Sequence, residues 1–206
     1  MYLPRRLRRD GMAANFDSTG SAALNLMNDR SVVHKSSTLG SRILKVDHAG
    51  EHGAICIYTG QIFAARLTAR DRVDELKEFR SHERRHRAIF WSELQRRGQR
   101  RCRSYWLCAL GGFVLGVGTG LLGRKAISDT TVAIESVVLR HLERQLDLLR
   151  GSDDAAVVAI SSIVDDERQH HDHSAAQLQR DTFWPRVLSP IVAASTEAVI
   201  WVGMRA

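Results

Sequence analysis

The chain is poor in cysteine, proline and tyrosine, with three of each among its 206 residues. Because the three cysteines are odd in number and form no Cys-x-x-Cys pair, they argue against a disulfide framework, a zinc finger and an iron–sulfur cluster. Few prolines leave long stretches free to form helix, and no alternating apolar and polar run bounded by turn residues marks a strand. These absences favour an all-α protein of a reducing compartment.

The sequence also lacks a dinucleotide fingerprint. The glycines Gly116, Gly118 and Gly120 do not follow the G-x-G-x-x-G spacing, and no βαβ pattern surrounds them. The net charge of +7 could serve nucleic acid, but the main arginine run lies beside the most apolar segment and contains no interleaved aromatics. We therefore expect no nucleic-acid partner.

The most informative feature that is present is an acidic–histidine pattern that occurs twice with the same spacing. In each copy a lone Glu is followed 32 residues later by Glu-x-x-His. The copies are Glu51 with Glu83 and His86, and Glu135 with Glu167 and His170. Residues three apart share one face of a helix, so each Glu-x-x-His can hold one metal ion. This set, used twice, is typical of a two-metal centre in a four-helix bundle.

The expected helix boundaries bring these ligands together. We predict bundle helices at about 41–68, 71–97, 126–150 and 153–181. The break before the last helix suits Gly151 as a C-cap and Ser152 or Asp153 as an N-cap. Each ligand then lies at a similar distance from its own turn, so two antiparallel hairpins place all six ligands at nearly one height.

The types of donor restrict the metal. Mixed carboxylate and imidazole ligands suit Fe(II) or Mn(II). Four carboxylates facing two divalent ions also leave the site close to neutral, which lowers the cost of burying those charges. We therefore predict a buried centre that holds two metal ions.

Two apolar segments accompany the bundle, at residues 104–123 and 187–203. The first runs for twenty residues without a charge and has arginine or lysine on both flanks. A single membrane span would separate the two hairpins, so we expect both segments to face a membrane from one side. We assign membrane contact or substrate access to Trp106, Phe113, Gly116 and Gly120. A buried crossover helix in a soluble protein remains the alternative for residues 104–123.

The glycines Gly112, Gly116 and Gly120 recur at every fourth position of the first apolar segment. Small residues at this spacing let two helix backbones approach closely. The spacing therefore predicts a face that packs against another helix.

The first forty residues differ in character from the rest. Residues 1–42 hold seven Lys or Arg against three Asp, which accounts for +4 of the net charge. No hydrophobic core of a secretory signal is present. We interpret residues 1–40 as a disordered basic leader or a mitochondrial transit peptide, with a disordered tail of a bacterial protein as the alternative. Residues 41–206 form the predicted functional domain.

Several motifs of that domain resemble one known family. They are Val46–Ala54 (VDHAGEHGA), Ile57–Gln61 (IYTGQ), Gly116–Gly123 (GVGTGLLG), Thr131–Glu135 (TVAIE) with His141, and Asp166–Asp172 (DERQHHD). Over about residues 41 to 206 the chain resembles the demethoxyubiquinone hydroxylases of ubiquinone biosynthesis. The resemblance implies a ferritin-like bundle with two irons that hydroxylates the demethoxyubiquinol ring with O2, in the penultimate step to ubiquinol.

The resemblance also implies where the protein works and with what. It implies peripheral attachment to the matrix side of the mitochondrial inner membrane, or to the cytoplasmic side of a bacterial membrane. NADH is the expected source of electrons. The expected partners are membrane-dissolved demethoxyubiquinol and other ubiquinone-biosynthesis proteins, including a lipid-binding companion, and assembly into a homo-oligomer is left open.

Four further residues are candidates for supporting roles. A carboxylate that holds a ligand imidazole fixes its orientation, and we expect Asp166 to do so for His86 in the opposite hairpin. Asp47 and Tyr58 lie on the same helix face as Glu51, and His141 is expected to relay protons or touch the quinone. The rival functions are an iron store, a soluble di-iron peroxidase and a tRNA hydroxylase.

Overall fold

The computed structural model describes the backbone of residues 18–178 and 183–205, and side chains from residue 39 onward. All regular structure within these ranges is helical. The elements are α1 (Ser18–Thr68), the short 3₁₀ helix η1 (Arg70–Arg72), α2 (Val73–Arg96), α3 (Tyr105–Leu121), α4 (Arg124–Leu149), α5 (Asp154–Ser161), α6 (Val164–Ala176) and α7 (Phe183–Arg205). The predicted all-α fold is confirmed.

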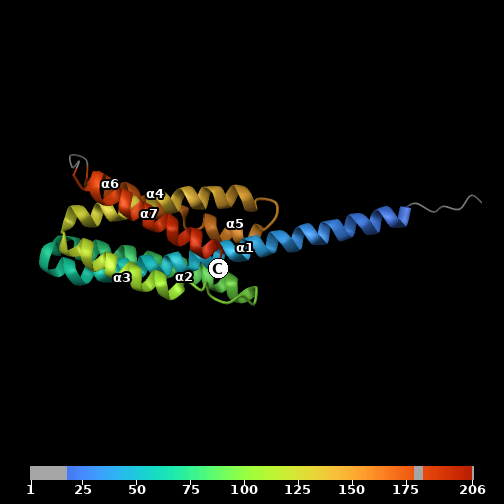
Figure 1. The fold of residues 1–206 in the computed structure, drawn as a ribbon, viewed down its shortest axis with the longest axis horizontal. Helices are drawn as coiled ribbons and strands as arrows, with labels where there is room; N and C mark the ends of the chain where they lie inside the picture. The colour runs from blue at the N-terminus through green and yellow to red at the C-terminus, as the bar shows by residue number, and fades with distance from the viewer. Residues whose placement is uncertain (1–17, 179–182, 206) are drawn as a thin grey trace, which may run out of the picture. The chain divides into compact units, whose positions relative to one another are not determined.

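The helices from residue 36 onward belong to one compact unit, a ferritin-like four-helix bundle with two added helices. Figure 1 shows α1 and α2 as one antiparallel hairpin, with α4 and the α5–α6 pair as the second. Helix α3 packs along α1, and α7 packs along α4. The two apolar helices therefore cover the bundle rather than join it.

Each bundle helix buries a stripe of residues at helical spacing, and the carboxylates of interest lie within these stripes. In α2 the stripe consists of Leu76, Phe79, Glu83, His86, Phe90 and Leu94. Phe79 belongs to one apolar cluster, with Tyr58 and Ile127, whereas Phe90 belongs to another. The polar pair of α2 thus lies between two apolar clusters, in the middle of the bundle.

The ends of the two hairpins are tied together by an ion pair. Gly151 adopts a φ of 71°, and the Ala156 N–H donates to Asp153 Oδ1 at 3.2 Å, as the predicted capping requires. Arg97, just after α2, donates through both terminal nitrogens to the Asp153 carboxylate at 2.6 Å. Because this bidentate contact fixes α5 to the end of α2, it sets the relative height of the hairpins.

Helix α3 packs against α1 through glycines. A Cβ added at Gly112 or Gly116 would overlap the backbone carbonyl of Gly53 or Ile57, and one at Gly120 would lie 2.8 Å from the Ala64 Cβ. The predicted close-packing face is confirmed. The assignment of Gly116 and Gly120 to membrane contact or substrate access is wrong, because both are buried against α1 and neither lines the cavity described below.

Two helix boundaries differ from the prediction. Helix α1 begins at Ser18 rather than near residue 41, in a stretch without proline, and the interpretation of residues 1–40 as a leader stays a prediction. Residues 1–17 of the predicted leader lie outside the described residues. The helix predicted at 153–181 breaks after Ser161, where Ser162 Oγ donates to the Ala159 carbonyl at 2.7 Å. A serine hydroxyl that competes for backbone carbonyls in this way commonly bends a helix.

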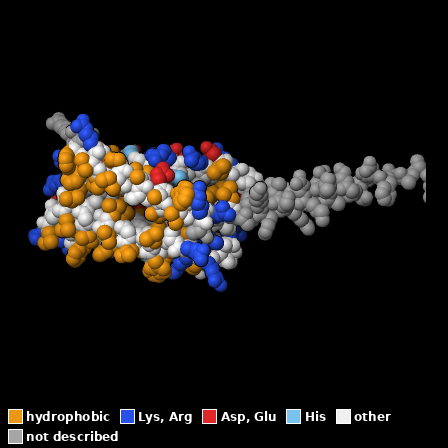
Figure 2. Space-filling model, viewed as in Figure 1, with side chains coloured by type: hydrophobic (Ala, Val, Ile, Leu, Met, Phe, Trp, Pro, Cys, Tyr) orange, Lys and Arg blue, Asp and Glu red, His pale blue; other side chains and the backbone are white. Residues whose placement is uncertain are grey.

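The two added helices expose apolar side chains. Helix α7 is long and apolar enough to cross a membrane by length and composition, whereas α3 is apolar but shorter. Figure 2 shows hydrophobic side chains gathered over α3 and α7 on the face in view. The large exposed ones are Trp106, Leu107, Leu110, Phe113, Val114 and Leu121 on α3, and Phe183, Val187, Ile191, Trp201 and Val202 on α7. Such a contiguous patch on a small protein marks an interaction surface.

The glycine packing predicts opposite effects for two identical substitutions. Gly116→Ala should lower the free energy of unfolding by about 1–3 kcal/mol, because its Cβ meets the α1 backbone. A Cβ at Gly118, on the same helix, meets no atom within 4 Å. Gly118→Ala should therefore raise the free energy of unfolding by up to about 1 kcal/mol, because Ala has the higher helix propensity. Urea unfolding measures both, and equal effects would contradict the close approach of α3 to α1.

Candidate metal centre

The structure brings the six predicted ligand residues together in the middle of the bundle. They are Glu51 on α1, Glu83 and His86 on α2, Glu135 on α4, and Glu167 and His170 on α6. None of the six is more than 6% exposed. A buried carboxylate normally requires a compensating charge, so four of them in one place need cations.

The six side chains form two overlapping groups, each able to hold one ion. In each group the ligand atoms lie within 4.8 Å of one another. One group consists of Glu51, Glu83, His86 and Glu167, and the other of Glu83, Glu135, Glu167 and His170. Glu83 and Glu167 occur in both groups, which makes them the candidates to bridge two ions, with Glu51 and Glu135 as terminal carboxylates.

Both imidazoles present the same nitrogen to the carboxylates. His86 Nδ1 lies 2.9 Å from Glu167 Oε1, and His170 Nδ1 lies 3.3 Å from Glu83 Oε1. Although these atoms are close, both Nδ1 atoms lack a hydrogen-bond partner of acceptable geometry among the described residues, as do Glu83 Oε1 and Glu167 Oε2. Buried polar atoms that converge without bonding one another fit a shared cation between them. Carboxylate and imidazole donors of this kind suit iron or manganese.

The opposite nitrogen of each imidazole is held by the other hairpin. His86 Nε2 lies 3.0 Å from Asp166 Oδ2, the contact expected for Asp166 from the sequence. His170 Nε2 lies 3.0 Å from His82 Nδ1, a partner that the sequence analysis missed. The repeat contained the signal, because His82 precedes Glu83 just as Asp166 precedes Glu167. Such partners fix the orientation of a ligand imidazole.

Two of the four carboxylates, Glu51 and Glu135, disfavour their charged forms when no cation is present, whereas contacts with His170 and His86 outweigh burial and lower the pKa of Glu83. Burial, followed by the neighbouring Glu83, raises the pKa of Glu51 well above its usual range. Burial and the neighbouring Glu167 do the same to the pKa of Glu135. Burial lowers the pKa of His170, but its contacts with Glu167 and Glu83 outweigh this and raise it to about 9. In the absence of metal the cluster therefore holds protons where cations would otherwise bind.

The remaining supporting candidates lie close to the cluster but differ in their contacts. The Tyr58 hydroxyl donates to Glu135 Oε1 at 3.3 Å, within one of the two ligand groups. His141 Nε2 lies 2.8 Å from Glu197 Oε2 on α7 and does not contact a ligand carboxylate in any described hydrogen bond. Asp47 accepts a hydrogen bond from Gln145 Nε2 at 2.9 Å, and no described hydrogen bond joins it to a ligand residue.

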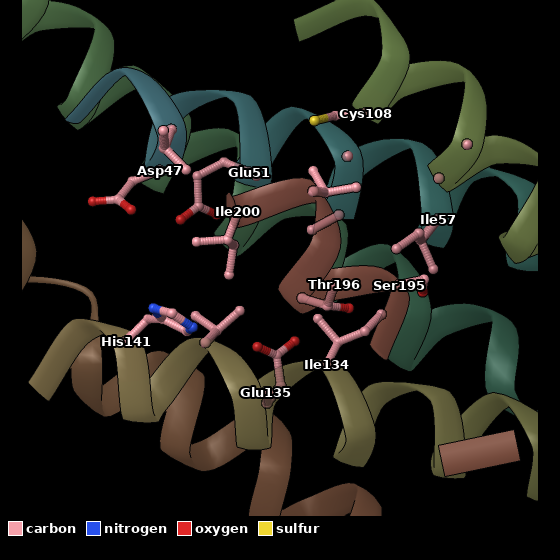
Figure 3. A pocket seen from close by; sticks show the side chains of 18 of the residues that line it. Asp47, Glu51, Ile57, Cys108, Ile134, Glu135, His141, Ser195, Thr196 and Ile200 are labelled. Atoms are coloured by element: carbon pink, nitrogen blue, oxygen red, sulfur yellow. The ribbon is translucent and has the colours of Figure 1, made fainter. Parts of the chain in front are cut away.

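A cavity of about 590 Å³ adjoins the cluster. Glu51, Glu83, Glu135 and Glu167 form part of its lining, and most of the remaining wall is apolar. Figure 3 shows Glu51 from α1 and Glu135 from α4 pointing toward the same space, with Ile57, Ile134 and Ile200 around it. The volume falls in the range of about 300–1,000 Å³ that is usual for small-molecule sites.

The cavity reaches the surface between the two apolar helices. Its lining includes Leu107 and Val114 of α3 and Ile191 of α7, each more than half exposed. Trp106 and Phe113, which were assigned to membrane contact or substrate access, do not line it. They lie on a different side of α3 from the lining stripe at residues 107, 111, 114 and 115, and both are exposed, so membrane contact stays the predicted role of these two residues.

Comparisons with known proteins agree with the site. Residues 38–203 match the family described as "Ubiquinone biosynthesis protein COQ7". A 3-demethoxyubiquinol 3-hydroxylase of Rhodospirillum rubrum is 37% identical over 170 residues, or 82% of this chain and 79% of that protein. The "NADPH-dependent 3-demethoxyubiquinone 3-hydroxylase, mitochondrial" of Dictyostelium discoideum is 32% identical over 173 residues, or 80% of this chain and 76% of that protein.

The overlapping ligand groups predict how metal content depends on two carboxylates. Glu83→Gln should lose most of both ions, since Glu83 belongs to both groups, whereas Glu135→Gln should lose mainly one. Glu135→Gln should also stabilise the metal-free protein at neutral pH, because it removes a carboxylate whose pKa burial raises. Elemental analysis and thermal unfolding measure these effects.

Glu78→Gln provides the matched control, because Glu78 is exposed on the same helix as Glu83. It should leave both metal content and stability unchanged. Full metal content in Glu83→Gln, or a Glu135→Gln protein that is less stable without metal, would show that the cluster is a structural ion-pair network instead.

Proposed function

This chain belongs to the ubiquinone biosynthesis protein COQ7 family, and from that membership we propose that it is a 3-demethoxyubiquinol 3-hydroxylase. The reaction adds a hydroxyl group to the ring of demethoxyubiquinol with O2, in the penultimate step of ubiquinone synthesis. One observation carries the proposal: a buried pair of carboxylate–imidazole ligand groups borders an apolar cavity that opens between two exposed apolar helices.

The metal is proposed to be iron, with two ions per chain. Two irons bound there would supply the electrons that activate O2 for transfer of one oxygen atom to the ring, with the second atom leaving as water. Glu51, Glu83, His86 and Glu167 would hold one ion, and Glu83, Glu135, Glu167 and His170 would hold the other.

The protein's own contribution is to hold these groups and exclude water. Asp166 and His82 fix the outward nitrogens of His86 and His170, so both Nδ1 atoms face the carboxylates. Tyr58 donates to Glu135 and thereby restrains that carboxylate. The apolar cavity wall keeps bulk water from the reacting ring, which protects the oxidising step from side reactions.

The exposed apolar helices support a membrane-bound substrate. A quinol with a long isoprenoid tail stays in lipid, so its ring must reach the cavity directly from the membrane. Leu107, Val114 and Ile191 line the cavity and also face outward, which provides such a route between α3 and α7. The exposed arginines Arg100, Arg101 and Arg103 before α3 are placed to contact lipid phosphates.

The proposed location follows from this route. The protein attaches peripherally to the membrane that contains its substrate, which is the mitochondrial inner membrane on the matrix side or the bacterial cytoplasmic membrane on the cytoplasmic side. Relatives of both kinds are known, since eukaryotic ones are named mitochondrial and others are bacterial. Other ubiquinone-biosynthesis proteins, including a lipid-binding companion, are proposed to approach the same membrane surface.

The electron donor is proposed to be a reduced nicotinamide cofactor. The sequence favoured NADH through family resemblance, whereas the names of the mitochondrial relatives specify NADPH. An assay that supplies each cofactor separately distinguishes the two. The rival roles of iron store, peroxidase and tRNA hydroxylase lose support, because the relatives over most of the chain are named as ubiquinol-ring hydroxylases.

The proposed reaction is tested in a strain that lacks its own hydroxylase and accumulates demethoxyubiquinone. The wild-type chain should restore ubiquinone, and Glu135→Gln should restore almost none. Gly111→Phe should also fail, because Gly111 lies in the α3 stripe that lines the cavity, where a Cβ meets no atom within 4 Å.

Gly118→Phe is the matched control for this cavity variant. A Cβ at Gly118 likewise meets no atom within 4 Å, but the residue does not line the cavity, so ubiquinone should be restored. Restoration by Glu135→Gln would refute catalysis at the cluster, and restoration by Gly111→Phe would refute the cavity as the substrate route.

Membrane attachment is tested by flotation with vesicles of phosphatidylcholine and anionic phosphatidylglycerol. The wild-type chain should float with the vesicles, whereas a Leu110→Glu, Phe113→Glu double variant should remain in the dense fraction, because it places two charges on the exposed side of α3. A Leu148→Glu, Val158→Glu variant changes exposed apolar residues of α4 and α5 and should float normally. Flotation of all three proteins alike would contradict a docking role for α3.

A further inference from the structure

Two polar side chains interrupt the apolar wall of the cavity away from the metal ligands. Asp47 on α1 and Gln145 on α4 both line the cavity and meet through the hydrogen bond from Gln145 Nε2 to Asp47 Oδ1. Each has one oxygen left over. Asp47 Oδ2 and Gln145 Oε1 are buried and have no hydrogen-bond partner among the described residues.

The other polar groups of the wall outside the metal cluster differ, because they already have partners. His141 Nε2 pairs with Glu197 Oε2, and the hydroxyls of Ser195 and Thr196 donate to the Val192 carbonyl. A buried acceptor without a donor is costly and is uncommon in native proteins. The two leftover acceptors therefore point to a donor that enters the cavity with its occupant.

The position of Asp47 suits a ring substrate. Asp47 lies four residues before Glu51, so the two side chains are neighbours on one face of α1. Figure 3 shows both carboxyl groups on the side of α1 that borders the cavity. A ring anchored by a hydroxyl at Asp47 would therefore extend from there toward the metal carboxylates.

We propose that Asp47 Oδ2 accepts a hydrogen bond from a ring hydroxyl of the substrate, and that Gln145 positions the Asp47 carboxyl group for this contact. The ligand class is an aromatic alcohol, either a phenol or a quinol, and the inference rests on the proposed function for the choice of that class. Asp47 is a substrate-binding residue in this account, and Gln145 acts through it.

The ionisation of Asp47 is compatible with this role. Burial raises the pKa of Asp47 to about 7, although the hydrogen bond from Gln145 opposes the shift. A hydroxyl donor at Oδ2 would stabilise the carboxylate, as the Gln145 amide already does at Oδ1.

The test compares two probes on the iron-loaded full chain without O2. One probe is a methoxy-methylphenol with a short alkyl tail, and the other is its methyl ether, which cannot donate a hydrogen bond. The wild-type chain should bind the phenol roughly tenfold more tightly than the ether, as loss of a hydrogen bond to a charged acceptor implies. Asp47→Leu should bind both probes alike, with ether affinity unchanged.

Three further variants complete the design. Gln145→Leu should reduce the ratio of phenol affinity to ether affinity. If Gln145 served only to link α1 to α4, its loss would leave this ratio unchanged. Asp47→Asn keeps the shape of the side chain and should also reduce the ratio. It serves as the test if Asp47→Leu does not fold. Asp147→Leu, on the exposed surface of α4, should retain the wild-type ratio.

The outcomes separate this inference from the proposed function. If Asp47→Leu and Asp47→Asn keep the wild-type ratio, the hydroxyl is bound elsewhere and the subsite is wrong, while the cavity remains the ring site. If the wild-type chain binds both probes equally, the subsite is also wrong. If neither probe binds the iron-loaded wild-type chain, the proposed function fails together with the subsite.

Discussion

The burial of four carboxylates in the middle of the bundle is the constraint on which the rest of the structure depends. Without cations, like charges at this depth would be prohibitively costly, and the raised pKa values of Glu51 and Glu135 express that cost. Apolar clusters lie on both sides of the site, so the carboxylates cannot relax toward water. The tie between Arg97 and Asp153 keeps the hairpins at matching height, and each hairpin orients the other's imidazole. The bundle thus holds six side chains in place as a site that could bind metal ions.

The two added helices form the route by which the proposed lipid substrate would reach this enclosed centre. Helix α3 approaches α1 within glycine-packing distance, at a point where Gly53 lies two residues after the ligand Glu51. Helix α3 is therefore a close neighbour of the helix that carries a ligand, and the cavity that opens between α3 and α7 is mostly apolar. Helix α7 forms another wall and contributes Glu197, the partner of His141. The same arrangement shields the six clustered residues from water and would admit the ring of the proposed substrate through the opening between α3 and α7.

The sequence revealed the parts of the structure that follow from spacing. The duplicated Glu…Glu-x-x-His pattern identified the hairpins and the six clustered residues, because helical periodicity places i and i+3 on one face. Other features depend on tertiary packing. Trp106 and Phe113 face away from the cavity lining. Their direction depends on how the glycines of α3 pack against α1. The break after Ser161 involves neither proline nor glycine and reflects one serine hydrogen bond. The partnership of Asp47 with Gln145 joins residues 98 positions apart, which no local pattern shows.

Diffraction at the iron absorption edge from crystals of the iron-loaded chain tests the central claim most directly. The account predicts two iron peaks, both within coordination distance of Glu83 and Glu167, with Nδ1 of His86 bound to one iron and Nδ1 of His170 to the other. A single iron, irons outside the six-residue cluster, or coordination through the Nε2 atoms that face Asp166 and His82 would contradict it.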